Sequence, residues 1–172
     1  MISVDEALKK IFEILPRNGK EKISLLDACG RVLAEDILAK NDQPPFSASA
    51  MDGYVISDPV PKLGSSYKLV GEVSAGSTFS RVLRNGEAVR IFTGAPVPIG
   101  GTRVIIQENM VIKCNTVTIN ELNSNETFIR KKGSDFKLGQ KFEPPKELNP
   151  FHLSLIASMN SSEVTVYKKP TV

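Results

Sequence analysis

The sequence contains no tryptophan, only two cysteines and a single histidine among its 172 residues. Cys29 and Cys114 are too few and too far apart for a disulfide scaffold, so we expect both to be reduced packing residues. His152 cannot supply the ligand set of a structural zinc site. A catalytic triad is not supported either, because no Ser or Cys stands in a nucleophile motif that His152 could serve.

Long apolar runs and concentrated charge are also missing. No segment approaches the roughly 18 apolar residues of a membrane span, and the N-terminus has acidic residues where a signal peptide has basic ones. The net charge of +3 is spread along the chain, whereas nucleic-acid binders gather it on one face or in a tail. We therefore expect a cytoplasmic protein with neither a membrane nor a nucleic-acid partner.

What is present indicates a globular, β-rich protein with a helix at each end. The chain is 41% hydrophobic and 24% charged, which is a globular composition. Residues 3–15 predict an amphipathic helix in which Ser3 and Glu6 form a capping box, and Pro16 and Gly19 end it. Its apolar stripe comprises Val4, Ala7, Leu8, Ile11, Phe12 and Leu15.

Between the terminal helices, the pattern predicts mostly strands. A short helix over 25–29 should end at Gly30 and precede an extended segment over 31–38, after which two prolines mark a boundary. Asn149 and Pro150 begin the last helix, whose apolar face we expect to include Phe151, and Asn160 suits a left-handed cap. The predicted strands cover 54–57, 67–73, 88–92, 103–107, 110–114, 116–119, 127–131 and 163–167.

Three short segments could carry chemistry. In the first, residues 47–54, Asp52 lies in a turn of small residues beside Gly53, where a carboxylate can meet a cation. In the second, residues 91–98, the amides of Thr93, Gly94 and Ala95 could converge on an anion. In the third, residues 129–135, three cations precede Asp135, which could hold Mg²⁺ near a phosphorylated ligand.

Each of these segments also has a plain structural interpretation. The first fits a turn whose aspartate bonds its own backbone, the second fits a structural loop, and the third fits a solvated strand end. The second segment is not a P-loop, and no dinucleotide-binding glycine pattern occurs in the chain. Taken singly, none of the three segments decides between a site and a turn.

Together and in this order, the segments resemble a known family. The chain is similar to the N-terminal and linker region of molybdopterin molybdenumtransferases, the MoeA and gephyrin E-domain family. Two departures are Gly101-Thr102-Arg103, where the family often has Gly-Ala-Asp, and Asn160, where it often has glycine. The segments that carry the resemblance are Gly30–Asp36, Ser49-Ala-Met-Asp-Gly-Tyr54, Ile91-Phe-Thr-Gly-Ala-Pro-Val-Pro98, Arg130-Lys-Lys-Gly-Ser-Asp135 and Leu153–Pro170.

The resemblance implies a fold. We expect an α+β, β-rich chain in which a barrel-like or bifurcated β domain (46–139) is inserted into a small α+β domain (20–45 and 140–172). The N-terminal helix (1–19) would pack on a later α/β domain that binds molybdate. Because this sequence stops at Val172, the resemblance implies a fragment that lacks that domain and is inactive alone.

The resemblance also implies a function and a set of site residues. The family inserts molybdate into adenylated molybdopterin and releases AMP in a step that uses a divalent cation, usually Mg²⁺. Carried over by position, Asp52, Thr93 and Asp135 would be catalytic, with Asp52 and Asp135 holding the metal ion. The cofactor-binding set would comprise Ser49, Gly53, Thr93 and Gly94.

The partners implied are small-molecule substrates, a second copy of the chain in a homodimer, and molybdopterin adenylyltransferase as a companion protein. Two alternatives remain open at this point. The chain could be a dimerisation or peptide-binding scaffold module of the gephyrin E-domain type, or a paralogue that serves tungsten.

Overall fold

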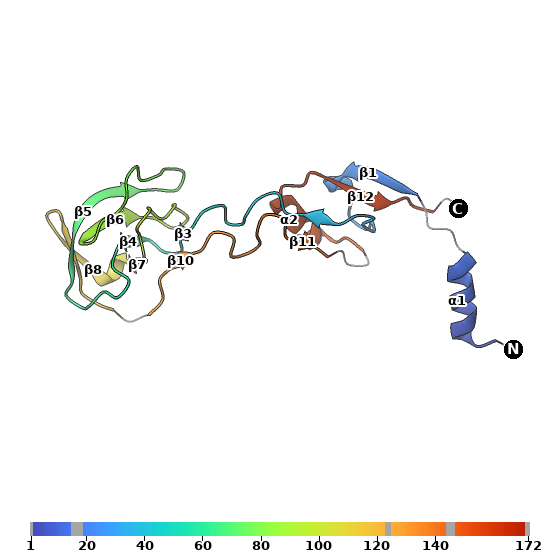
Figure 1. Ribbon diagram of the computed structural model, residues 1–172, viewed down its shortest axis with the longest axis horizontal. Coiled ribbons are helices and arrows are strands. Elements are labelled where there is room, and N and C mark those ends of the chain that lie inside the picture. Colours follow the sequence, from blue (N-terminus) through green and yellow to red (C-terminus); the bar gives the residue numbers. More distant parts are fainter. Residues whose placement is uncertain (1, 15–18, 123–124, 144–146, 171–172) are drawn as a thin grey trace. The chain divides into compact units, whose positions relative to one another are not determined.

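The computed structural model describes residues 2–14, 19–122, 125–143 and 147–170 (Figure 1). The chain divides into two compact units. One unit comprises residues 1–41 together with 139–172, and the other comprises residues 42–138. None of the helices in the described part of the chain combines the length and the apolar character needed to cross a bilayer.

The unit of residues 42–138 contains a curved, six-stranded sheet, so the chain has the β-rich α+β fold predicted (Figure 1). The strand order is β7-β4-β6-β5-β9-β8, and β5 with β6 is the one parallel pair in this sheet. The strands are β4 (Gly53–Ile56), β5 (Ser66–Val73), β6 (Glu87–Ile91), β7 (Arg103–Ile106), β8 (Met110–Lys113) and β9 (Thr116–Ile119).

Both faces of this sheet are covered, because alternate side chains of its strands enter two separate clusters. Tyr54 and Ile56 of β4 join one cluster, and Val55 between them joins the other. β4 is therefore buried along its whole length, which fixes the position of the turn immediately before it. Both clusters are made mainly of Ile, Val and Ala, consistent with the scarcity of aromatic residues.

The other unit is built on two short antiparallel ladders and a helix. β1 (Lys20–Ser24) pairs with β12 (Glu163–Tyr167), and β2 (Ile37–Leu38) pairs with β11 (Lys141–Phe142). Helix α2 (Pro150–Ser158) buries Ile156, and Val166 of β12 is also fully buried. Segments from both ends of the sequence thus form one core.

The predicted helix caps are confirmed. Asn149 accepts the His152 backbone N–H at 3.0 Å, and His152 Nδ1 accepts the Asn149 N–H at 3.1 Å, which completes a capping box. Asn160 lies after α2 with φ of 64°, as expected for a left-handed cap. Ser3 and Glu6 exchange hydrogen bonds of 3.2 Å at the start of helix α1 (Val4–Ile14).

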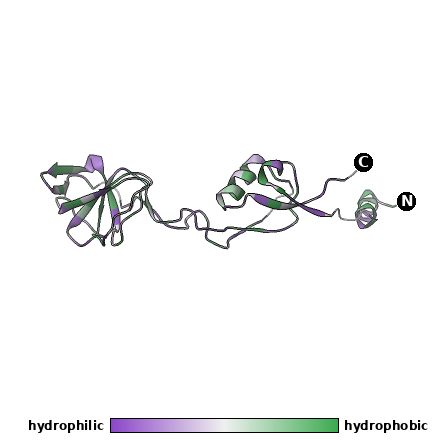
Figure 2. Cartoon of the chain, turned by 90° about the horizontal axis from the view of Figure 1, so that it is seen from above, coloured by the Kyte–Doolittle hydropathy of each residue, from purple (hydrophilic) through white to green (hydrophobic). Residues whose placement is uncertain are grey.

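Helix α1 presents its apolar stripe to solvent. No residue of α1 is buried, and Figure 2 shows hydrophobic and hydrophilic residues side by side on this helix. The largest exposed side chains are Val4, Leu8, Ile11, Phe12 and Ile14. Leu15 and Pro16, which we predicted to end the stripe and the helix, lie outside the described residues.

Four expectations were wrong. Residues 25–27, not 25–29, form a helix, and it is a single 3₁₀ turn capped by the Ser24 hydroxyl. The segment 31–38, which we expected to be extended, bends at Ala34 and Glu35, between an isolated bridge at Leu33 and the strand Ile37–Leu38. The cysteines are free but exposed, so they are not packing residues. Phe151 is 84% exposed, although Ile156 of α2 and Met159 just after it, which we expected on the same apolar face, are buried.

Candidate functional site

A two-residue strand, β3 (Ala48–Ser49), joins the three segments that the sequence singled out. On one side, Ser49 and Ala48 pair with Ile129 and Arg130 of β10 (Ile129–Arg130). On the other, Ala48 forms a bridge with Pro96. Residues far apart in the sequence are thereby held together by backbone contacts.

Asp52 and Thr93 meet directly. Asp52 Oδ1 accepts the Thr93 backbone N–H and the Thr93 hydroxyl, each at 2.7 Å. Asp52 is thus not a turn aspartate bonded to its own backbone, since its partner is 41 positions away. These hydrogen bonds hold the pKa of Asp52 below its usual value, with the Thr93 N–H as the largest cause and the Thr93 hydroxyl as the second. Thr93 is exposed, so the pair is accessible from solvent.

The amides of the second segment do not form the anion-binding nest we predicted. The Thr93 N–H is taken by Asp52, the Gly94 N–H donates to Ser49 O at 2.9 Å, and the Ala95 N–H donates to Phe92 O at 2.9 Å. All three donors are used within the fold. The anion that this loop binds is the Asp52 carboxylate itself.

Ser49 and Gly53 lie below the surface of the turn. Ser49 is 3% exposed, and its hydroxyl donates to Met51 O at 2.6 Å. Gly53 is buried in β4, where an added Cβ would lie 2.1 Å from the carbonyl oxygen of Ile105 in β7. Close approach of two strands, rather than a left-handed backbone, is what requires glycine at position 53.

Asp135 lies in the third segment and is bound within it. Its carboxylate pairs with the guanidinium of Arg130, and Ser134 Oγ donates to its Oδ1 at 3.4 Å. The Arg130 hydrogen bond is the main reason that the pKa of Asp135 is below its usual value. The Asp135 backbone N–H donates to Gln43 O at 2.9 Å, which fixes this turn to the chain entering the unit. Neither Asp52 nor Thr93 contacts Asp135 among the interactions of the described residues.

Three residues near Asp52 were not predicted from the sequence: Arg90, Gln107 and Glu108. Gln107 donates its backbone N–H to Asp52 O at 3.1 Å and its side-chain amide to Glu108 at 3.0 Å. The bond from the Gln107 side chain is the main reason that the pKa of Glu108 is below its usual value. Arg90 of β6 donates to Gly53 O at 3.3 Å and to the Gln107 side chain. The available signal was an arginine within a strand of otherwise apolar residues, Ala88–Ile91.

A cavity of about 670 Å³ adjoins the site through Arg90. Arg90 and Tyr54 form one part of its wall, and the irregular stretch of β5, where the register with β6 shifts between Leu69 and Glu72, forms another. Its volume lies within the range of small-molecule pockets. Lys68 and Asn115 also line it, so its surface is mixed in polarity.

The acidic groups fit a magnesium ion only in part. No cluster of three or more His, Cys, Asp or Glu side chains that could hold a metal ion occurs among the residues described. Asp52 has one oxygen occupied by Thr93, which leaves its second oxygen for a cation. Mg²⁺ commonly takes one or two carboxylates and completes its shell with water and substrate phosphates. Asp52 suits that chemistry, whereas the carboxylate of Asp135 is engaged by Arg130.

Comparison with known proteins identifies the family. Residues 2–160 match the family described as the MoeA N-terminal region, domains I and II. The chain belongs to this family. Relatives that match include a molybdopterin molybdenumtransferase of Haemophilus influenzae, 35% identical over 98% of this chain, and one of a Nostoc species, 32% identical over the whole of this chain.

Solved structures agree with this assignment. Two crystal structures of a molybdopterin biosynthesis MoeA protein from Pyrococcus horikoshii match 99% of this chain with a TM-score of 0.83, at 26% and 29% identity. The chain spans 42–43% of the length of the two transferases and 45–46% of these solved chains. The resemblance inferred from the motifs is thus confirmed for the N-terminal region.

Proposed function

We propose that this chain is part of a molybdopterin molybdenumtransferase, which inserts molybdate into adenylated molybdopterin and releases AMP. The observation that carries the proposal is the direct contact of Asp52 with Thr93 at an exposed edge. The turn before β4 and the loop after β6, with their aspartate and threonine 41 positions apart, meet there. The family, and relatives named molybdopterin molybdenumtransferase, support this class of reaction.

Asp52 would act as a fixed negative charge. With its pKa lowered, the carboxylate stays ionised at neutral pH, and Thr93 holds one of its oxygens. Both donors are in place before any ligand arrives, so the site needs no reorganisation to hold a cation. Preorganised charge of this kind suits phosphate chemistry, in which positioning dominates over covalent catalysis.

Thr93 would contact the pterin rather than a phosphate. Its hydroxyl hydrogen is already donated to Asp52, so the oxygen can accept but has no further hydrogen to give. Pterin rings carry N–H donors, whereas phosphate oxygens only accept. Gly94, Ser49 and Gly53 would shape this loop and turn so that both side chains reach the ligand.

Mg²⁺, when bound, would neutralise phosphate charge on the adenylate. Asp52 would hold it through its second oxygen, and Asp135 would act on its water shell while remaining paired with Arg130. We further propose a cytoplasmic homodimer, with molybdopterin adenylyltransferase as a companion, since that enzyme makes the adenylated substrate.

Asp52→Asn in the full-length protein tests the proposal. The amide oxygen can still accept from Thr93, so the fold should survive while the charge is lost. We expect the rate of metal insertion to fall by a factor on the order of 10² or more. The measurement is AMP release in the presence of molybdate and adenylated molybdopterin.

A matched control is Asp58→Asn. Asp58 is also a turn aspartate that accepts a backbone N–H, from Val60, and a hydroxyl, from Tyr67, each at 3.0 Å, but it contacts none of the proposed site residues. Its replacement should leave insertion within about twofold of the parent, because surface changes away from a site usually have small effects. Retained insertion in Asp52→Asn, with circular dichroism unchanged, would refute the assigned site.

A further inference from the structure

The guanidinium of Arg90 lies over two aromatic rings. It lies opposite Tyr54 in the antiparallel β4–β6 pair, and its guanidinium carbon is 5.0 Å from the centre of the Tyr54 ring. Phe92, two residues further along, lies 4.8 Å away on the same measure. A planar, weakly hydrated guanidinium is well suited to contacts with ring faces.

From this position Arg90 reaches the backbone of the Asp52 turn and its neighbour. One terminal nitrogen donates to Gly53 O at 3.3 Å, and the other donates to the side-chain oxygen of Gln107. The Gln107 backbone N–H in turn donates to Asp52 O at 3.1 Å. The Gly53 carbonyl is thus held by Arg90 directly, and the Asp52 carbonyl is held by the backbone of Gln107, whose side chain Arg90 binds.

We propose that Arg90 is a positioning residue for the candidate site, which holds the Asp52–Gly53 turn so that the Asp52 carboxylate meets Thr93. It acts through the fork of its guanidinium and its ring contacts rather than through charge alone. The assignment rests on the proposed function only in treating Asp52 as a site residue.

This role requires arginine and not lysine. A lysine ammonium is a compact point charge that cannot reproduce a planar fork lying over two rings. Arg90→Lys keeps the charge and removes the geometry, whereas Arg90→Gln removes both. The two variants therefore separate an electrostatic effect from a positional one.

Hydrogen exchange of the Thr93 amide, measured by NMR on the 172-residue chain, reports the Asp52–Thr93 contact without any ligand. We expect both Arg90 variants to accelerate exchange at Thr93 on the order of tenfold, while amides of the buried β6 residue Val89 keep their protection. The matched control is Arg81→Gln, because Arg81 likewise combines a ring contact, 5.3 Å to Phe79, with side-chain hydrogen bonds, here to Glu87, but does not touch the turn.

Unchanged Thr93 exchange in both Arg90 variants would overturn the proposal, as would an Arg90→Lys variant that behaves like the parent. If replacing Arg90 also exposes Val89, Gln107→Leu decides instead, because it removes the acceptor from a surface 3₁₀ turn and leaves the strand intact. Faster exchange at Thr93 then supports the proposal, and parental exchange refutes it.

Activity of the full-length variants separates this inference from the proposed function. A positioning role predicts that Arg90→Lys lowers kcat more than it raises KM. If Asp52→Asn retains activity, the proposed site is wrong. The hydrogen-exchange measurement still tests, independently of activity, whether Arg90 holds the Asp52–Thr93 contact.

Discussion

Replacing the glycine at position 53 should lower the stability of the fold by a measurable amount. An added Cβ would lie 2.1 Å from the Ile105 carbonyl oxygen and 2.9 Å from its carbon, and both atoms belong to the backbone of β7. Two paired strands would have to separate next to Asp52. We predict that Gly53→Ala lowers the free energy of unfolding by on the order of 3 kcal/mol, measured by urea denaturation.

Gly71→Ala is the matched control for that substitution. Gly71 also lies in a strand of this sheet, and its added Cβ would meet Phe79 at 2.9 Å. There the neighbour is the end of a half-buried side chain, which can rotate away, so the loss should be much smaller. Equal losses in the two variants would contradict our account of position 53.

At the scale of residues, the sequence could indicate Asp52, Thr93 and Asp135 but not how they are connected. Small residues and glycine around Asp52 predicted a tight turn, and the resemblance supplied the three candidates. The bond from Asp52 to Thr93 spans 41 positions and depends on sheet register, which no local pattern reveals. Arg90 was missed for the same reason, because its partners lie on two other segments.

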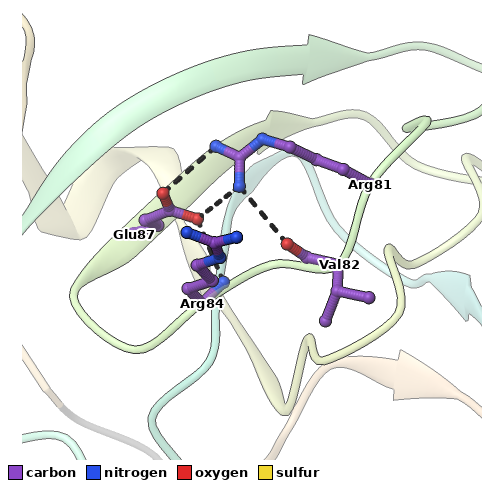
Figure 3. Close-up of polar contacts among 4 residues, drawn as sticks. All are labelled: Arg81, Val82, Arg84 and Glu87. Carbon is purple, nitrogen blue, oxygen red and sulfur yellow. Dashed lines mark hydrogen bonds and ion pairs between the residues drawn. The ribbon is translucent and has the colours of Figure 1, made fainter.

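At the scale of elements, the loop that leads into β6 is closed by an ion pair (Figure 3). Arg81 donates to both oxygens of Glu87 at 2.8 and 3.1 Å, and the Arg84 N–H donates to Glu87 at 3.0 Å. These bonds lower the pKa of Glu87, and the hydrogen bonding from Arg81 is the largest cause. Because the folded pKa lies below the unfolded one, the stabilisation exists above the unfolded pKa and disappears as pH falls through the folded pKa.

Acid titration of stability should therefore depend on Glu87. We predict that Glu87→Gln loses less stability than the parent as the pH falls from about 5 to 3, because the parent gives up an ionised, hydrogen-bonded carboxylate. Urea midpoints across this range provide the measurement, with Glu13→Gln on the exposed helix α1 as control. Parallel curves for the parent and Glu87→Gln would show that the pair contributes nothing.

Strands of four or more residues with an apolar pattern were predictable, whereas the strand rich in charge and the two-residue strand β3 were not. The positions of β5, β6, β9 and β12 agree with their alternating or continuous apolar patterns to within one residue at either end. β1 was missed because its sequence, Lys-Glu-Lys-Ile-Ser, carries three charges and is held by its pairing with β12. The two-residue strand β3 depends wholly on distant partners, so a local pattern contains no signal for it.

At the scale of the whole molecule, the chain enters and leaves the unit of residues 42–138 through neighbouring segments. Gln43 and Phe136 form an antiparallel bridge, and Asp42 Oδ1 accepts the Leu138 N–H at 2.8 Å. On the other side of the boundary, Ala39 donates to Gln140 O at 2.9 Å and accepts from Gly139 at 2.8 Å. Each unit therefore has its own closure where the chain crosses.

We propose, on this basis, that residues 42–138 form an inserted domain that folds without the rest of the chain. Contacts within the unit already hold its two ends together, so cutting the chain there should remove few of the interactions that stabilise its fold. The excised segment should give an amide NMR spectrum in which the resonances of β4 to β9 overlay those of the 172-residue chain. A second variant, Asp42→Ala within the excised segment, should lose order first at Leu138 and Lys132, both of which bind this carboxylate. A collapsed spectrum from the unaltered excised segment would show that the inserted unit needs its neighbour in order to fold.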